Sequence, residues 1–339
     1  MKEDSLKRIL VFNVNWIGDV LFSTAVIRNI RYNYPKGYIS CIIPERCYPV
    51  LEGNPYLDEI IIFDEKNRHQ GLSAKISFIR LIKRKRFDTA ILLHGSFTRA
   101  LICKIAGIPE LIGYATKKRG FLLAQKIAPL DKDAVHRIDY YLNIIKQSGF
   151  EVKDRYLEFF VPKQDEDFAE DFLNKYLGGQ NDFLIGINPG GNWLPKRWPK
   201  ENWIKLTDLL MRKPGVRVVI TGGKEDLPLA REITAALKSG PLVICGVFNL
   251  KQSAALFKRL NVFISADSGP MHIANAVGTK KIIALFGPTD PSITGPYPQD
   301  NVIIFRKDAG CKIPCYVVDC QDNRCMKEIT AEEVIGKIW

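Results

Sequence analysis

The 339-residue sequence lacks most features that mark membrane, secreted or metal-dependent proteins. No apolar run approaches the roughly 20 residues needed to cross a bilayer. Its four histidines include no pair at ligand spacing, and its cysteines include no paired C-x2-C, so a classical zinc site is not expected. Neither the G-x4-G-K-[ST] of P-loop hydrolases nor a G-x-G-x-x-G after the first strand is present, which argues against a P-loop hydrolase or a dehydrogenase.

The sequence is strongly basic, with 49 Lys and Arg against 37 Asp and Glu and a formal net charge of +12. Such an excess favours anionic partners: nucleic acid, an anionic membrane surface or phosphorylated substrates. No zinc-finger or aromatic-basic RNA-binding pattern occurs, so nucleic acid is not expected. The clusters 83–86 and 117–119 are either solvated helix ends or an anion-binding surface. The start of the chain contains acidic residues and leads directly into a predicted strand, which is not typical of a signal peptide, and we expect a cytoplasmic protein.

The eight cysteines fall into two groups. Those in apolar surroundings are expected to be core residues; they are Cys41, Cys47, Cys103 and Cys245. The others cluster within 15 residues, and three interpretations of them stay open: structural thiols, a metal site or disulfides. They are Cys311, Cys315, Cys320 and Cys325. A reducing cytoplasm argues against stable disulfides.

Length and pattern predict two α/β domains. Apolar strands alternate with amphipathic helices in each half, which is typical of a parallel sheet covered by helices on both faces. A change of composition suggests a linker around 157–166, which divides the chain into domains 1–160 and 161–339. The last helix of the second domain could pack back on the first. Open sheets of this kind bind ligands at the carboxyl ends of their strands, so we expect a cleft between the two halves.

Four loops follow predicted strands at such positions. The first is Asn15-Trp-Ile-Gly-Asp19, where Gly18 permits close approach of another molecule, and Asp19 is either a helix N-cap or a base. The second is Asn188-Pro-Gly-Gly-Asn-Trp-Leu-Pro-Lys-Arg-Trp-Pro199. Its glycines Gly190 and Gly191 are expected to expose backbone N–H groups. Lys196 and Arg197 add two cations suited to a diphosphate, unless the segment is only a surface loop.

The third loop, Thr221-Gly-Gly-Lys-Glu-Asp226, is Gly-rich, and Glu225 either accepts from ribose hydroxyls or belongs to a solvated turn. The fourth is the turn at Asp267, Ser268 and Gly269, followed by a short helix that contains His272. Free N–H groups at this helix start attract anions, whereas the simpler interpretation makes Asp267 an N-cap. The acidic D-x-D patterns at 131–133 and 165–167 do not follow convincing strands, and we do not interpret them as metal sites.

Four motifs together resemble glycosyltransferase family 9, the ADP-heptose:lipopolysaccharide heptosyltransferases, over nearly the whole chain. They are Trp16-Ile-Gly-Asp19, Asn188-Pro-Gly-Gly with Lys196-Arg-Trp-Pro199, Ala266-Asp-Ser-Gly-Pro-Met-His272 and Leu285-Phe-Gly-Pro-Thr-Asp290. The forms of the first two are most similar to heptosyltransferase II. The resemblance implies a GT-B fold, in which two Rossmann-like domains face a cleft. Family members usually place a basic residue just before the first turn, where this chain has Asn13 and Asn15.

The resemblance also implies residue roles. Asp19 matches the general base, and Lys196 matches the lysine that binds the donor diphosphate. Asp267 matches an acid that holds the donor sugar, with Ser268 and Gly269 as backbone donors to the phosphates. His272 matches a histidine near the phosphates, and Glu225 corresponds approximately to a ribose-binding acid. Further donor contacts are expected from Gly190, Gly191 and Arg197, and acceptor contacts from Asn15, Trp16 and Gly18.

The implied function is inverting transfer of heptose from ADP-heptose to the lipopolysaccharide inner core, without a metal or other cofactor. The N-terminal domain would bind the acceptor and the C-terminal domain the nucleotide sugar. Basic clusters of the first domain would hold the enzyme at the anionic inner face of the inner membrane. Two alternatives stay open. One is a relative that uses another nucleotide sugar for a different surface glycan, and the other is a non-catalytic nucleotide-sugar-binding protein.

Overall fold

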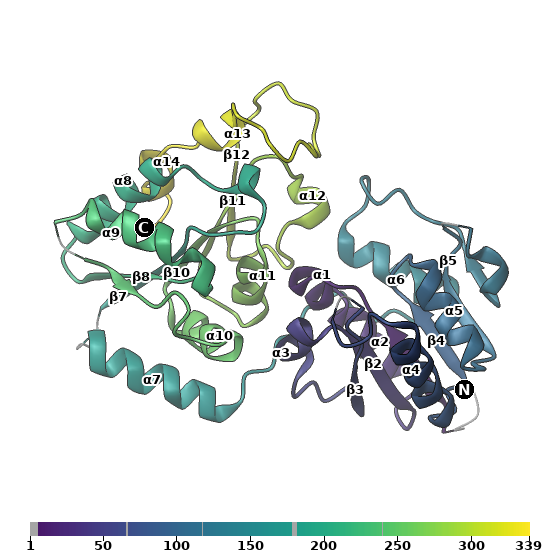
Figure 1. The fold of residues 1–339 in the computed structure, drawn as a ribbon. Helices are drawn as coiled ribbons and strands as arrows, with labels where there is room; N and C mark the ends of the chain where they lie inside the picture. The colour runs from purple at the N-terminus through teal and green to yellow at the C-terminus, as the bar shows by residue number, and fades with distance from the viewer. Residues whose placement is uncertain (1–5, 66, 117, 178–181, 239) are drawn as a thin grey trace. The chain divides into compact units, whose positions relative to one another are not determined.

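The computed structural model describes residues 6–65, 67–116, 118–177, 182–238 and 240–339. The chain divides into two compact units, Met1–Phe160 and Val161–Trp339. Each unit contains a six-stranded parallel sheet whose buried strands are flanked by helices (Figure 1). Among the described helices, none is long and apolar enough to cross a membrane.

The first unit is a sheet of strand order β3-β2-β1-β4-β5-β6. Its strands are β1 (Arg8–Phe12), β2 (Tyr38–Ile43), β3 (Glu59–Ile62), β4 (Thr89–Leu92), β5 (Glu110–Tyr114) and β6 (Gln125–Ile127). Its helices are α1 (Ile17–Phe22), α2 (Thr24–Asn33), α3 (Tyr48–Leu51), α4 (Leu72–Arg84), α5 (Phe97–Ile105) and α6 (Arg137–Gln147). The apolar strands β1, β2 and β4 lie in the middle of the sheet, where both faces are covered, as parallel sheets require.

The second unit repeats the topology with the order β12-β11-β10-β7-β8-β9. Its strands are β7 (Phe183–Asn188), β8 (Val216–Ile220), β9 (Leu242–Val243), β10 (Val262–Ala266), β11 (Ile282–Phe286) and β12 (Val302–Arg306). Its helices are α7 (Lys163–Leu177), α8 (Lys200–Met211), α9 (Leu227–Ala235), α10 (Leu250–Arg259), α11 (Gly269–Ala276), α12 (Pro291–Thr294), α13 (Arg324–Lys327) and α14 (Ala331–Ile335). Numbered within its own unit, each sheet has the order 3-2-1-4-5-6 of the Rossmann fold.

The elements add to the predicted alternation of strands and helices. After β1 the chain forms two helices, α1 and α2, which meet at Ser23. The strands β5, β6 and β12 were not predicted; β6 is only three residues long, whereas β12 contains the apolar run Val-Ile-Ile-Phe, which was not interpreted. The last helix, α14, lies in the core of its own unit with Trp198 and Trp203.

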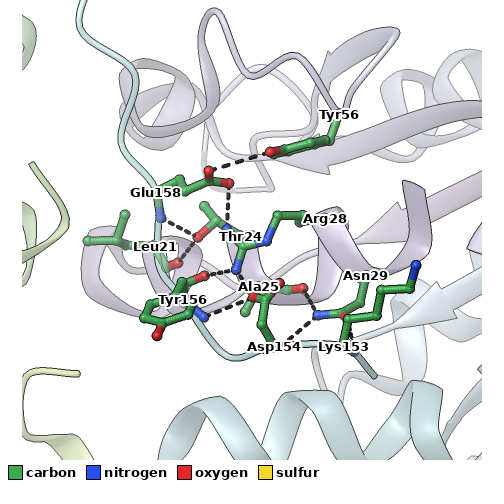
Figure 2. A network of polar contacts seen from close by, with 10 residues as sticks. All are labelled: Leu21, Thr24, Ala25, Arg28, Asn29, Tyr56, Lys153, Asp154, Tyr156 and Glu158. Carbon is green, nitrogen blue, oxygen red and sulfur yellow. Dashed lines mark hydrogen bonds and ion pairs between the residues drawn. The ribbon is translucent and has the colours of Figure 1, made fainter. Parts of the chain in front are cut away.

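The connection between the units is shorter than the predicted linker 157–166. Arg28 on α2 ion-pairs with Asp154 and with Glu158, and donates to the Tyr156 carbonyl oxygen at 2.6 Å (Figure 2). These contacts fix the segment 153–158 to the first unit. The acidic stretch that starts at Asp165 is not linker but the first turn of α7. It belongs to the second unit, because α7 packs on α10 and Glu166 ion-pairs with Lys258 at 2.6 Å.

The cysteines divide as predicted by environment. Cys41, Cys47, Cys103 and Cys245 are buried, which confirms them as core residues, and burial raises the pKa of Cys41 to about 12. The four clustered cysteines are exposed or half-buried free thiols. Across the residues that the structure describes, no group of three or more His, Cys, Asp or Glu side chains has a metal-binding arrangement.

Candidate active site

The strand order identifies where each sheet is suited to bind a ligand. In the first unit, the chain runs from β1 toward one edge of the sheet and from β4 toward the other edge. In the second unit, the chain after β7 and the chain after β10 diverge in the same way. The crevice at such a switch point, beyond the carboxyl ends of the strands, is where open α/β sheets bind ligands. Three of the four predicted loops follow β1, β7 and β10, so each unit has predicted site residues at its switch point.

In the first unit, Asp19 lies in the first turn of α1, just after β1, and is half-buried. Its Oδ1 accepts a hydrogen bond of 2.9 Å from the hydroxyl of Tyr141, a buried residue of α6. The N-cap of α1 is Trp16, which makes no side-chain cap bond. Asp19 is therefore not the N-cap of this helix, and its carboxylate is held by a neighbouring helix instead.

Two arginines hold the turn before Asp19. Arg99, buried on α5, donates to the Asn13 carbonyl oxygen and to the Asn15 side-chain oxygen, both at 2.6 Å. Arg46 donates to the Asn15 carbonyl oxygen at 2.8 Å, and its guanidinium lies 4.6 Å from the Trp16 ring centroid. The two asparagines thus lie beside cations that other elements of the first unit supply. Trp16 itself is 59% exposed, and Gly18 is half-buried in the first turn of α1.

In the second unit, Lys196 and Asp267 form an ion pair of 2.6 Å between Nζ and Oδ2. Lys196 ends a short 3-10 turn after β7, whereas Asp267 follows β10 directly. The same Oδ2 accepts from the hydroxyls of Thr289 at 2.7 Å and Thr294 at 3.2 Å. The Lys196 side chain is 23% exposed and that of Asp267 only 5%, so the lysine is the more accessible partner.

The surroundings of Asp267 keep it ionised. Burial alone would raise its pKa, but the hydrogen bond from His272 and the charge of Lys196 outweigh burial and hold the pKa well below its ordinary value. His272 is a buried residue of α11, with its Nε2 3.7 Å from Asp267 Oδ1. The structure therefore brings Lys196 next to Asp267, which lies 71 residues later in the sequence, and to the nearby His272.

The start of α11 lies beside this cluster. Its N-cap is Ser268, which makes no side-chain cap bond and whose hydroxyl lies 3.0 Å from that of Ser265. The interpretation of Asp267 as the N-cap is therefore wrong, because its carboxylate is turned toward Lys196 and the two threonines. Gly269 and Pro270 form the first turn, half-buried, with the positive end of the helix dipole at this edge of the sheet.

The glycine pair after β7 lies beside the carboxylate of Asp226. This buried carboxylate accepts from the backbone N–H of Gly223 at 2.9 Å. A Cβ at Gly190 would lie 1.9 Å from Asp226 Oδ1, so only glycine fits there. That Gly190 and Gly191 offer their backbone N–H groups to a ligand stays a prediction. Burial raises the pKa of Asp226 above its ordinary value.

The remaining predicted donor contacts are more exposed. Arg197 is half-buried, and its Nε donates to the Gly191 carbonyl oxygen at 2.8 Å, which ties the cation to the glycine loop. Glu225 is exposed on a 3-10 turn after β8, directly above Gly223. The Trp198 of the same motif as Lys196 is a core residue, because it is buried and its indole N–H donates to the Ile329 carbonyl oxygen at 2.8 Å.

Comparison with known proteins identifies the family. The model of "Glycosyltransferase family 9 (heptosyltransferase)" matches residues 75–324. The chain belongs to glycosyltransferase family 9. It is 30% identical to lipopolysaccharide heptosyltransferase 2 of Salmonella typhimurium, over 88% of this chain and 87% of that protein. It is 29% identical to lipooligosaccharide heptosyltransferase 2 of Haemophilus ducreyi, over 89% and 90%.

Solved structures agree with this glycosyltransferase along nearly its whole length. A family 9 glycosyltransferase from Veillonella parvula has a TM-score of 0.87 at 28% identity and covers 98% of this chain and 96% of its own. The E. coli ADP-heptose lipopolysaccharide heptosyltransferase II has a TM-score of 0.79 at 25% identity, with 97% and 96% covered. The two parallel sheets are thus those of a GT-B glycosyltransferase, as predicted.

Several residues around the glycosyltransferase site were not predicted. Three side chains contact the Asp19 turn from other elements, and no local sequence motif predicts them; they are Tyr141, Arg99 and Arg46. Thr289 lies within the Gly-Pro-Thr-Asp motif, which offered a signal that was not used. Asp226 ends the Gly-Gly-Lys-Glu-Asp loop, three residues after the N-cap Gly223. From there its carboxylate accepts from the N-cap backbone N–H, which is one half of a capping box.

The structure also changes the interpretation of the two basic clusters, 83–86 and 117–119. Arg119 is completely buried and donates to the carbonyl oxygens of Tyr114 at 2.9 Å and His94 at 2.5 Å, so it is no surface charge. Lys117 lies outside the described residues. In the other cluster, Lys85 ion-pairs with Glu59, whereas Lys83, Arg84 and Arg86 are exposed.

Proposed function

We propose that this glycosyltransferase transfers a heptosyl group from ADP-heptose to the inner core of lipopolysaccharide. The relatives named above support the donor and the acceptor, since they are called lipopolysaccharide or lipooligosaccharide heptosyltransferases. The E. coli structure is named for the same donor. The site of this chain supplies the chemistry that such a transfer needs, at one residue in the first unit and a cluster in the second.

The observation that carries the proposal is the Lys196–Asp267 pair beside the start of α11. When the glycosidic bond breaks, the leaving ADP gains negative charge on its diphosphate. The Lys196 ammonium group has three N–H donors and uses one of them at 2.6 Å for Asp267. That bond fixes the lysine in place, and its other N–H groups can donate to the diphosphate. Preorganised donors of this kind stabilise a leaving group without a metal, each contributing about 3 kcal/mol in typical enzymes.

Around Lys196, the donor contacts are proposed as follows. Ser268 and Gly269 offer backbone N–H groups to the phosphates, with Arg197, Gly190 and His272 nearby, and the exposed Glu225 accepts from the ribose hydroxyls. That Asp267 holds the donor sugar stays a prediction. Its Oδ2 already accepts from Lys196, Thr289 and Thr294, so we propose that Asp267 mainly positions the lysine.

Asp19 is proposed to be the general base. It would accept the proton of the acceptor hydroxyl while that oxygen attacks the anomeric carbon on the face opposite the diphosphate, which inverts the configuration. Its position at the switch point of the first sheet supports this role, and so does its orientation by Tyr141. Trp16, Gly18 and Asn15 in the same turn are proposed to contact the acceptor sugar, so the first unit binds the acceptor and the second the donor.

We also propose a peripheral association with the anionic inner face of the inner membrane. The exposed side of α4 carries Lys83 and Arg84 together with the exposed apolar side chains Leu72 and Ile76. A basic face with apolar side chains favours an anionic lipid surface. This would hold a cytoplasmic enzyme next to its lipid-linked acceptor.

Calorimetric titration tests the donor. ADP-heptose, ADP-mannose, a GDP-sugar and a UDP-sugar are titrated into the purified protein, followed by a transfer assay with lipopolysaccharide that lacks heptose. We expect ADP-heptose to bind most tightly and to support transfer. If another sugar nucleotide binds more tightly and supports transfer, the donor assignment is wrong, and the protein is still a glycosyltransferase. Binding without any transfer would contradict the proposed reaction.

A further inference from the structure

Tyr141 is a buried side chain that faces the proposed base from another helix. It is 5% exposed, and its hydroxyl donates to Asp19 Oδ1 at 2.9 Å across 122 residues of sequence. A hydrogen bond to a carboxylate is stronger and more directional than one between neutral groups. A donor fixed inside the unit therefore determines how the Asp19 carboxylate is turned.

The backbone around Tyr141 is itself held on both sides. The hydroxyl of Tyr114 on β5 donates to the Tyr140 carbonyl oxygen at 2.6 Å, and Asn143 donates to the same hydroxyl at 3.2 Å. The neighbouring Asp139 accepts from Arg155 at 2.8 Å. The sheet and the chain that follows α6 thus fix the turn of helix from which Tyr141 reaches Asp19. Such support is what a precisely placed catalytic group requires.

The surroundings also fix the protonation of the tyrosine. Burial and the nearby Asp19 charge raise the pKa of Tyr141 well above its ordinary value, against the opposing effect of Arg137. Cys47, whose thiol donates to the Asn15 carbonyl oxygen in the turn before Asp19, has a pKa raised to about 11, mainly by burial. Both groups therefore stay protonated between about pH 5 and pH 9. In that range Tyr141 can donate to Asp19 and cannot itself act as the base.

We propose that Tyr141 is a positioning residue for Asp19: its hydroxyl turns the carboxylate so that it can accept the proton of the acceptor hydroxyl. This rests on the proposed role of Asp19 as the base. The tyrosine would act through the carboxylate and would not touch the substrate. In the transfer step the proton passes to Asp19, the new bond forms at the anomeric carbon, and the bond to the diphosphate breaks.

The direct test is the titration of Asp19 in Tyr141→Phe, which removes one hydroxyl and keeps the ring. Carboxyl carbons of labelled aspartate are followed by NMR between pH 3 and pH 8, and the Asp19 signal is identified by its loss in Asp19→Asn. Losing a donor to the ionised form makes that form less stable, so we expect the Asp19 midpoint to move to higher pH. The matched control is Tyr140→Phe, the adjacent tyrosine, which should leave the midpoint unchanged.

Kinetics give a second readout. We expect Tyr141→Phe to lower kcat for transfer about tenfold, as one charge-assisted hydrogen bond typically contributes, with an unchanged KM for the donor. The acid limb of the pH profile should move to higher pH with the NMR midpoint. His136, which caps α6 and contacts the Phe22 ring on α1, is another ionisable side chain beside α1. The variant His136→Asn is therefore included, and its pH profile should keep the acid limb of the wild type.

The outcomes separate the two proposals. An unmoved Asp19 midpoint in Tyr141→Phe, with the protein folded by circular dichroism, would overturn the positioning role. Full activity in Asp19→Asn would instead remove the base assignment and leave the NMR result intact. A shifted midpoint with unchanged kcat would also overturn the role in transfer, because orientation would then not matter to the reaction.

Discussion

Lys196 and Asp267 show how a charged pair can be stable in a nearly buried position. The aspartate side chain is almost enclosed, and its desolvation opposes ionisation. It accepts from Lys196, Thr289 and Thr294, so its charge is compensated by three donors. Removing one member of such a pair is much more costly than removing an exposed ion pair, because the other charge is left in a poorly solvated place.

The pair predicts a pH-dependent loss of stability in Asp267→Asn. The folded pKa of Asp267 is lowered, so its contribution is fully present above the unfolded pKa of about 4 and is lost as pH falls through the folded pKa. We expect the variant to lose about 3 kcal/mol of unfolding free energy at pH 7 and clearly less at pH 3. Urea unfolding followed by tryptophan fluorescence measures both values, since four of the five tryptophans lie in the second unit.

Asp208→Asn on α8 is the matched control for this experiment. Its carboxylate pairs with the exposed Arg212 at 2.5 Å, and such exposed pairs contribute less than about 1 kcal/mol. An Asp267→Asn variant that loses the same free energy at pH 3 as at pH 7 would contradict the ionised state of Asp267.

At the scale of elements, the segment 153–158 is the best-defined part of the connection between the units. Arg28 binds Asp154, Glu158 and the Tyr156 carbonyl oxygen, while Asn29 on the same helix accepts from the Lys153 backbone N–H at 2.7 Å (Figure 2). Burial alone would lower the pKa of Arg28, but its bonds to the two carboxylates outweigh burial and raise it. The segment therefore belongs to the first unit up to Glu158.

Replacing Arg28 should release this segment. We expect Arg28→Met to destabilise the first unit by about 3 kcal/mol, because it leaves the carboxylates of Asp154 and Glu158 without their cation. Amide hydrogen exchange in 151–160 should become faster, with binding of ADP unchanged. Arg31→Met, on the same helix but paired with Asp58, should leave exchange in 151–160 as in the wild type. Unchanged exchange in Arg28→Met would show that other contacts hold the segment.

The basic face of α4 gives a second prediction at this scale. A triple variant, Lys83→Gln, Arg84→Gln and Arg86→Asn, removes three exposed cations, and asparagine suits the positive φ of 50° at position 86. At about 1 kcal/mol per cation near an anionic surface, binding to vesicles with phosphatidylserine should weaken about a hundredfold. The control removes three exposed lysines of the same unit, Lys104, Lys126 and Lys146, by substitution with Gln. An equal loss of vesicle binding in both variants would show that the net charge, and not the α4 face, causes the binding.

At the scale of the whole molecule, the sequence predicted the fold well where strands are continuous apolar runs. Both sheets and strands such as β2 and β7 follow from such runs, since a strand buried on both faces must be apolar along its length. The GT-B class was implied instead by the resemblance of the motifs to glycosyltransferase family 9. The three-residue β6 was missed because it has a single apolar residue, whereas β12 carries an apolar run that was not interpreted as a strand. The extent of the linker was missed because an acidic stretch after Pro162 also makes a good first turn of a helix, as in α7.

The site was predictable only where its chemistry is local. Asp19, Lys196 and Asp267 lie within motifs at the ends of strands, and the structure places them at the switch points of their sheets. Tyr141 was not predictable, because it meets Asp19 only through the packing of a distant helix. Thr289 lies in a recognised motif, but its contact with Asp267 becomes visible only in the fold. Asp267 was predicted as a donor-sugar ligand, with an N-cap as the simpler alternative, and only the fold shows that its carboxylate faces Lys196.

The most direct test of the proposed reaction is the rate at which Asp19→Asn transfers heptose from ADP-heptose to heptose-deficient lipopolysaccharide, measured beside its affinity for ADP. Asp19 lies in the first unit and the proposed donor contacts in the second, so the two quantities should separate. We predict ADP binding close to that of the wild type and transfer slower by at least about a hundredfold, as expected for loss of a general base. Wild-type transfer by Asp19→Asn would contradict the account.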